Sequence, residues 1–257
     1  MIHYRASEEI EIMKEGGKIL ALTLDHVLKA VKPGIKLSEL DAIAEHEIVS
    51  RGGYPSFKKV PGYHWTICAC LNDVVVHGIP DDTKIQPGDV VGIDCGVYYK
   101  GFHTDSSWTI RVPKPGSEQK DVDNFLNVGA HALHKAIKTV KVGNYIYDIS
   151  KTIQEIVEGA GFSVARTLVG HGVGRELHED PEIPGFVRLK RERTPQIKLG
   201  MTLAVEVIYM MGGSDIAYRK NDEWTIRTKD GTLSGLFEAT VAVSSHGCIV
   251  LTKIYGA

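Results

Sequence analysis

The sequence contains few cysteines, no excess of basic residues and no long apolar run, and each of these absences excludes a class of protein. It has four cysteines in 257 residues, too few for a disulfide framework, which is typical of a protein from a reducing compartment. Its formal net charge is −2, so no basic excess is present to bind phosphate, and we expect no direct nucleic-acid site. No apolar run approaches the length of a membrane span, and residues 1–17 lack the basic-then-apolar pattern of a signal peptide. We therefore expect a cytoplasmic protein without a membrane segment.

The sequence does contain regular helical and strand patterns. Apolar spacing predicts helices over 7–31, from Ser38 to the stretch RGGY, over about 120–140, and over about 147–159. Ser7 is expected to cap the first helix, and residues 38–41 to form a capping box for the second. The β-branched runs VVVHGI, DVVGIDCGVYY, TLAVEVIYM and FEATVAV predict strands. With 43% hydrophobic residues, the chain can bury a large core as one domain or two fused lobes.

The second half of the chain repeats the order of the first. Three pairs of segments match: 31–54 with 140–162, 84–94 with 196–206, and 76–79 with 170–173. His77 thereby corresponds to His171, and Asp94 corresponds to Glu206. Two copies of a unit of about 110 residues predict a duplicated α+β lobe about a pseudo-twofold axis. This symmetry would bring the two strand-end carboxylates toward a shared central cleft.

Carboxylates inside apolar strands indicate a metal site. If Lys100 and Gly101 form a two-residue hairpin turn, Asp94 lies diagonal to Asp105 on one face, about 7–8 Å away at the backbone. The alternative is that both are exposed hairpin acids. Two further acids, Glu206 and Glu238, lie in apolar strands that hold no lysine or arginine, where an unpaired charge is costly.

Four carboxylates and one imidazole make an oxygen-rich donor set. Such a set favours a pair of Mn, Fe, Co or Zn ions over a single structural zinc. Two ions about 3.5–4 Å apart can activate a water and polarise a carbonyl, so the inferred chemistry is hydrolysis. The pair Cys68 and Cys70 offers another metal site, but a role in a strand or pocket wall is favoured because no second cysteine pair accompanies it.

The stretch GHGVGRELHED at 170–180 carries two histidines, His171 and His178, among glycines. It is neither the zinc-protease motif HExxH nor a dinucleotide loop, since Arg175 stands where the latter needs glycine. Together with the four carboxylates, this stretch supplies the imidazole of the donor set. The residues in the order Asp94, Asp105, His171, Glu206 and Glu238 resemble the five metal ligands of the pita-bread metallopeptidases.

The resemblance is strongest to type I methionine aminopeptidases and covers nearly the whole chain. It is carried by the blocks NDVVVHGIP, GDVVGIDCGV, GFHTD, GHGVGRELHE, GMTLAVE, WTIRTKDGTLSGLFEATV and GCIVLT. It implies a curved antiparallel sheet between two pseudo-twofold-related lobes, within a single catalytic domain over 1–257 with halves of roughly 1–115 and 116–257. It also implies two divalent ions (Co, Mn, Fe or Zn) and removal of the initiator methionine from nascent chains when the next residue is small.

The resemblance implies a role for each site residue. His171 matches the imidazole ligand, and Glu206 matches the glutamate that is both ligand and proton shuttle. His178 matches the histidine that supports the oxyanion as water attacks, and His77 the histidine near the scissile nitrogen. The remaining residues match the methionine pocket: Tyr63, Cys68, Leu177 and Trp224.

Several positions depart from the family pattern. Ala239 stands where the family usually has histidine, and Val207 where it usually has proline. Leu177 replaces a common aromatic residue, and the segment 64–68 is short. All five ligands remain, so these departures affect the expected specificity more than the expected chemistry.

Two alternatives stay open. X-Pro aminopeptidases and prolidases share the fold and metal set but have a large N-terminal domain, for which this chain leaves no room. Metal-free pita-bread proteins act as non-enzymatic binding partners, but they lose ligands that this chain keeps. We expect a monomer. Because no zinc-finger extension precedes the core, a transient association with the ribosome would use the core surface.

Overall fold

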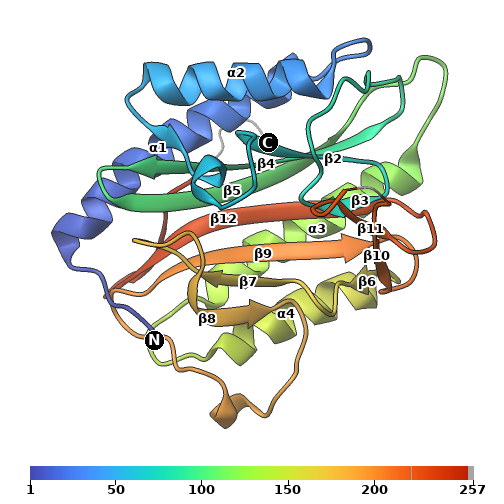
Figure 1. Ribbon diagram of the computed structural model, residues 1–257. Helices are drawn as coiled ribbons and strands as arrows, with labels where there is room; N and C mark the ends of the chain where they lie inside the picture. The colour runs from blue at the N-terminus through green and yellow to red at the C-terminus, as the bar shows by residue number, and fades with distance from the viewer. Residues whose placement is uncertain (221, 254–257) are drawn as a thin grey trace.

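Four long helices cover a layer of antiparallel strands in the computed structural model, which describes residues 1–220 and 222–253 (Figure 1). The helices are α1 (Ser7–Ala30), α2 (Leu37–Ser50), α3 (Lys120–Thr139) and α4 (Ile146–Gly159). All four lie within one residue of their predicted starts and ends, except that α2 ends at Ser50, just before RGGY. The pairs α1–α2 and α3–α4 come from the two halves of the chain, as the repeat predicted.

The predicted caps of the first two helices are wrong by one residue or more. Glu9 accepts a hydrogen bond from the backbone N–H of Ala6 at 3.0 Å, so Ala6, not Ser7, precedes the helix. Glu39 likewise accepts a hydrogen bond from the backbone N–H of Lys36 at 2.8 Å. The capping box of the second helix therefore spans 36–39 and not the predicted 38–41. A glutamate that reaches back from the first turn therefore sets each start, rather than a serine hydroxyl.

The strands form three sheets in which every ladder is antiparallel. One sheet holds β1 (Tyr54–Pro55), β2 (Ile67–Leu71), β4 (Val90–Tyr99) and β5 (Phe102–Arg111). The largest holds β6 (Ser163–Val164), β7 (Val169–Gly172), β8 (Glu179–Pro184), β9 (Thr202–Met210), β12 (Ser234–Ser244) and β13 (Gly247–Val250). A small third sheet holds β3 (Val74–Val76), β10 (Ile216–Tyr218) and β11 (Ile226–Thr228). Short 3₁₀ turns occur at Phe57–Lys59 and Arg191–Arg193.

The two larger sheets meet where β5 lies alongside β12 (Figure 1). Hydroxyl side chains join the two strands there: Ser106 Oγ donates to the carbonyl of Glu238 at 2.8 Å, and Thr240 Oγ1 donates to the carbonyl of Asp105 at 2.8 Å. The N–H of Asp105 donates in turn to Thr240 Oγ1 at 2.9 Å. Because these contacts fix the relative register of the two strands, they hold Asp105 and Glu238 close to one another.

The predicted hairpin register is confirmed. Lys100 and Gly101 have φ values of 46° and 93°, as a tight two-residue turn requires, and Gly96 pairs with Asp105. Asp94 therefore lies diagonal to Asp105, on the strand next to it. In the other sheet Glu206 and Glu238 stand directly opposite each other. The four acids thus come from the consecutive central strands β4, β5, β12 and β9.

Each half of the chain has its own apolar core. One core packs α1 and α2 against β2 and β4, with Leu24 and Ile93 fully buried, and the other packs α3 and α4 against β9 and β12. Trp108 packs against both cores. The α+β class and the two lobes are therefore confirmed, and the acids lie at the junction of the lobes.

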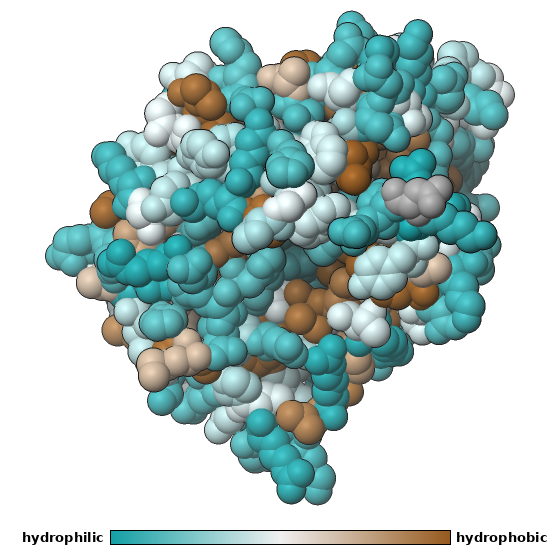
Figure 2. Space-filling model, in the orientation of Figure 1, coloured by the Kyte–Doolittle hydropathy of each residue, from teal (hydrophilic) through white to brown (hydrophobic). Residues whose placement is uncertain are grey.

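Hydrophilic side chains cover most of the face shown in Figure 2, and only small hydrophobic areas interrupt them. Within the described part of the chain, no helix combines the length and apolar character needed to cross a bilayer.

Candidate metal centre and its pocket

A cavity of about 120 Å³ lies at the junction of the lobes. It collects every side chain that the sequence analysis assigned to a site. These are Tyr63, Cys68, His77, Asp94, Asp105, His171, Leu177, His178, Glu206, Trp224 and Glu238. Residues far apart in the sequence, from six strands and from loops, therefore share one space, with no lysine or arginine among the residues that line it.

Glycines on both sides allow β7 to present His171 to the cavity. A Cβ atom on Gly172 would collide with the carbonyl of Asp180 on β8, and one on Gly170 would lie 2.6 Å from the carbonyl of Ala204 on β9. The strand therefore fits closely between its neighbours only with glycine at these positions. His171 Nδ1 lies 2.9 Å from the carbonyl of Gly172, and donation from Nδ1 leaves Nε2 free to bind a cation.

Three buried residues have the arrangement of a metal site. Ligand atoms of Asp105, His171 and Glu238 all lie within 4.8 Å of one another, and the three residues are 4%, 8% and 3% exposed. His171 Nε2 is also 3.3 Å from Glu206 Oε1. The fourth acid, Asp94, comes from the strand beside Asp105. All five predicted ligands are thus close together, and three of them form a tight cluster.

The carboxylates repel one another in a place with little water. Burial, together with the charges of neighbouring acids, raises the pKa values of Asp105 and Glu238. Burial and the charge of Glu206 raise the pKa of Asp94 to about 8. Burial alone would lower the pKa of His171, but its contact with Glu206 outweighs burial and raises that pKa. Among the described residues, no lysine or arginine lines the cavity to offset these charges.

Two carboxylate oxygens of the acids lack a hydrogen-bond partner within the described part of the chain. Asp94 Oδ1 and Glu238 Oε1 are buried, and neither has a hydrogen-bond partner among the described residues. A buried carboxylate oxygen without a partner is strongly unfavourable. An oxygen-rich set with one imidazole suits Mn, Fe, Co or Zn, so the donors fit divalent metal ions.

Two further histidines line the cavity beside this cluster. His77 follows β3 with a φ of 56°, a conformation that is uncommon for a residue other than glycine and is often retained at functional sites. His178 also lines the cavity, with part of its side chain exposed to solvent and its ring 4.5 Å from that of His171. Partial burial lowers the pKa of His77, and partial burial with the nearby His171 lowers the pKa of His178. Both rings are therefore neutral at neutral pH.

The opposite wall of the cavity is aromatic and apolar. The rings of Tyr63 and Trp224 meet edge to face at 5.1 Å, and His77 lies 6.4 Å from Trp224. Tyr63 Oη donates to the carbonyl of Ile67 at 2.8 Å and lies 3.3 Å from Cys68 Sγ. Cys68 therefore belongs to the pocket wall, as the sequence favoured, and no described metal cluster includes it.

Sequence reasoning missed three residues that complete this wall. Phe57, Val60 and Val76 also line the cavity, and the first two lie in or beside a 3₁₀ turn without any regular spacing. One signal was present. A Cβ atom on Gly96 would lie 2.7 Å from Ser56 Cβ, so this glycine inside a strand marks the close approach of the segment that carries Phe57.

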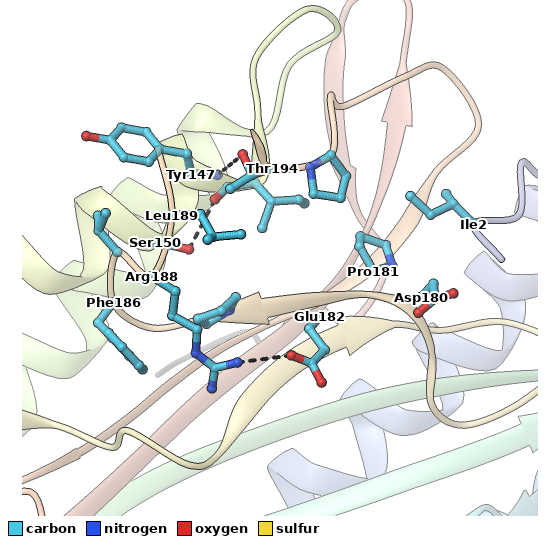
Figure 3. A pocket seen from close by; sticks show the side chains of 14 residues that line it. Ile2, Tyr147, Ser150, Asp180, Pro181, Glu182, Phe186, Arg188, Leu189 and Thr194 are labelled. Atoms are coloured by element: carbon cyan, nitrogen blue, oxygen red, sulfur yellow. Dashed lines mark hydrogen bonds and ion pairs between the residues drawn. The ribbon is translucent and has the colours of Figure 1, made fainter. Parts of the chain in front are cut away.

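A roomier cavity of about 520 Å³ lies between α4 and β8, away from this cluster (Figure 3). Apolar side chains such as Ile2, Pro181 and Leu189 line it, and Glu182 pairs with Arg188 at its edge. It contains neither histidine nor cysteine among its lining residues, so it lacks the imidazole donor that the first cavity has.

The chain is similar to known proteins over nearly its whole length. The model of metallopeptidase family M24 matches residues 11–245. A methionine aminopeptidase from Clostridium perfringens is 41% identical over 254 residues, which cover 99% of this chain and 100% of that protein. The crystal structure of a methionine aminopeptidase from Thermotoga maritima superposes with a TM-score of 0.93 at 36% identity, covering 98% of this chain and 100% of that one.

A second kind of structure shares only the fold. A prolidase from Pyrococcus furiosus superposes with a TM-score of 0.78 at 22% identity, covering 98% of this chain but 66% of the prolidase. Both kinds of relative have the pita-bread architecture that the sequence analysis expected. The similarity over full length is to the methionine aminopeptidases.

Proposed function

Because the chain belongs to metallopeptidase family M24, we propose that it is a metal-dependent methionyl aminopeptidase acting on nascent proteins. It removes the N-terminal methionine when the next residue is small. The observation that carries this proposal is the single cavity in which a buried carboxylate and imidazole cluster faces a narrow aromatic pocket. Whole-length similarity to methionine aminopeptidases supports the same activity.

The proposed metal site holds two divalent ions of Co, Mn, Fe or Zn. Its ligands are Asp94, Asp105, His171, Glu206 and Glu238. Support comes from the clustered ligand atoms of three of these residues and from the two carboxylate oxygens that lack partners. When bound, such ions supply Lewis acidity and lower the pKa of a water molecule.

The chain's own residues then handle the protons and the developing charge. Glu206 is the proposed proton acceptor for the attacking water, and its side chain is 13% exposed at the cavity. His178, neutral at neutral pH, donates an N–H to the substrate carbonyl and stabilises the oxyanion. His77 lines the same cavity, with its ring 6.4 Å from that of Trp224, and is the proposed histidine near the scissile nitrogen.

The aromatic wall accounts for selection of methionine. An unbranched thioether fits a narrow apolar slot, and its sulfur packs well against aromatic edges. Tyr63 and Trp224 present such edges, and Cys68 and Leu177 close the sides. In the proposal, the tight space beyond the metal centre restricts the second residue of the substrate to small side chains.

A comparison of four tripeptides tests the function. We expect kcat/KM to be highest for Met-Ala-Ser, low for Met-Lys-Ser, and about 10–200-fold lower for Leu-Ala-Ser, which is the range that one apolar pocket achieves. The fourth peptide is Ala-Pro-Ala, measured in the same buffer with the same metal. If it is cleaved best, the X-Pro alternative replaces the proposal. If the metal-loaded protein cleaves none of the four, a non-enzymatic binding role replaces it.

The remaining expectations belong to the same proposal. Residues 1–257 act as one catalytic domain, as a monomer in the cytoplasm, and associate transiently with ribosomes through the core surface. Light scattering after size-exclusion chromatography tests the monomer, and co-sedimentation with ribosomes tests the association.

A further inference from the structure

The N-terminal segment, residues 1–6, reaches the strand that follows His178. The ammonium group of Met1 pairs with the carboxylate of Asp180, and Ile2 forms a parallel β-bridge with the same residue. Figure 3 shows Ile2 near Asp180 and Pro181 at the edge of the roomier cavity. The N–H of Arg5 donates to the carbonyl of Gly200 at 2.7 Å. The segment is thereby fixed against the second half of the chain.

Arg5 forms a buried ion pair with Glu179, the residue after His178. The two side chains are only 4% and 8% exposed, although 174 positions separate them in the sequence. Gly174 makes room for the pair, because a Cβ atom there would collide with the guanidinium of Arg5. The Arg5 guanidinium also lies 5.9 Å from the ring centre of Phe102. Breaking a buried pair by removing one partner leaves an uncompensated charge, so this contact strongly favours one geometry.

The same carboxylate fixes the turn that leads to His178. Glu179 Oε1 accepts hydrogen bonds from the backbone N–H groups of Arg175 at 2.8 Å and Glu176 at 3.1 Å. Both of these residues are exposed, whereas Leu177 in the same turn is buried, and the Arg175 side chain pairs with Glu9 at 2.7 Å. Glu179 does not line the cavity of the metal centre. It therefore acts on the cavity only through the residues of the turn.

We propose that Glu179 is a positioning residue for the reaction, an inference that rests on the proposed function. Held by Arg5, it fixes the turn at 174–178 and so places the ring of His178 and the side chain of Leu177 against the metal centre. His178 supports the oxyanion, and Leu177 closes the methionine pocket. Loosening the turn should therefore lower kcat through His178 and raise KM for methionine peptides through Leu177.

A double-mutant cycle with His178 tests the proposal. The variant Glu179→Gln removes the ion pair while keeping an acceptor for the turn. Because a misplacement of about 1 Å costs up to about 10²-fold in rate, we expect kcat on Met-Ala-Ser to fall by about 10- to 10²-fold. In the His178→Ala background the same change should lower kcat no further, because its effect acts through the missing ring. The variant Arg5→Lys keeps the positive charge and should therefore lose less activity than the variant Arg5→Met.

Controls separate positioning from a loss of structure. Glu182 lies on β8, the strand of Glu179, and forms a partly exposed ion pair with Arg188 beyond the end of that strand. Glu182→Gln breaks this pair and should leave kcat unchanged. Metal content and melting temperature are measured for every variant, and if Glu179→Gln does not fold, the cycle is run with Arg5→Lys. An equal loss of kcat with and without His178, or no loss at all in an active protein, overturns the proposal.

A readout that needs no activity keeps the two proposals distinguishable. The imidazole NMR signals of His178 should shift in Glu179→Gln and stay in place in Glu182→Gln. An inactive wild-type protein with these shifts contradicts the proposed function and supports the positioning role. Unshifted signals in Glu179→Gln overturn the positioning role whatever the activity.

Discussion

Removal of divalent metal should destabilise the protein by an amount that grows with pH. In the metal-free site, burial and neighbouring charges raise the pKa values of Asp94, Asp105 and Glu238. A carboxyl group with a raised pKa keeps its proton in the folded state after the unfolded chain has lost it. Its contribution to stability is complete below its ordinary pKa and is lost as the pH rises through its folded pKa, about 8 for Asp94.

Two of the three histidines that line the cavity limit the pH range in which this loss of stability can be measured. The lowered pKa values of His77 and His178 have the opposite effect, because their contribution is lost as the pH falls below their ordinary value of 6.5. Between about pH 6.5 and about pH 7.5, each extra proton that the folded state holds lowers the stability by about 1.4 kcal/mol per unit rise in pH. For a chain of about this size, that change lowers Tm by about 3–6 °C. Bound metal keeps the carboxylates deprotonated in the folded state and removes this loss.

Calorimetric melting with saturating metal, and again in chelator, measures the effect at both pH values. Titrations elsewhere in the chain cancel in the difference between the two Tm values, so the difference should widen by about 3–6 °C per pH unit for each extra proton held. In the variant Asp94→Asn, which removes one of the three carboxyl groups, the widening should shrink. A difference that stays constant with pH, or one that narrows, would refute the reasoning about this cluster.

Three further predictions concern single residues. Glu206→Gln should lower kcat by about 10²–10⁴-fold in steady-state assays with its metal bound, because it removes the proton acceptor; near-wild-type kcat would exclude that role. His178→Ala should lower kcat by about 10²–10³-fold, as expected for a lost oxyanion donor, and an unchanged kcat would exclude that role too. Gly129→Ala should destabilise the protein by about 1–3 kcal/mol in denaturant melts, because the new Cβ would lie 2.5 Å from Tyr209 Oη, whereas Gly159→Ala meets nothing within 4 Å and should not.

Features that depend on neighbouring residues in the sequence were predicted well. The hairpin register followed from a two-residue turn and the alternation of strand residues, and it placed Asp94 diagonal to Asp105 as observed. The helices followed from apolar spacing. The capping residues of the first two helices did not, because a serine near a helix start competes with a glutamate that reaches back, and Glu9 and Glu39 form the caps.

Contacts between distant segments could not be predicted in the same way. The pair Arg5–Glu179 joins residues with no shared periodicity, and the only sequence signal near it is Gly174. Asp41 is a similar case. It was assigned to a helix cap, but its carboxylate accepts hydrogen bonds from the N–H groups of Thr66 and Ile67 at 2.8 and 3.0 Å, and so holds the start of the strand that carries Cys68.

The most direct test of the metal-dependent function is to count the metal and the turnover in the same sample. Freshly purified protein should contain up to two divalent ions per chain and cleave Met-Ala-Ser. Prolonged incubation with excess chelator should remove both the ions and the activity, and added metal should restore the activity. Full turnover of Met-Ala-Ser in excess chelator, with no residual metal detected, would contradict the metal centre built on Asp105, His171 and Glu238.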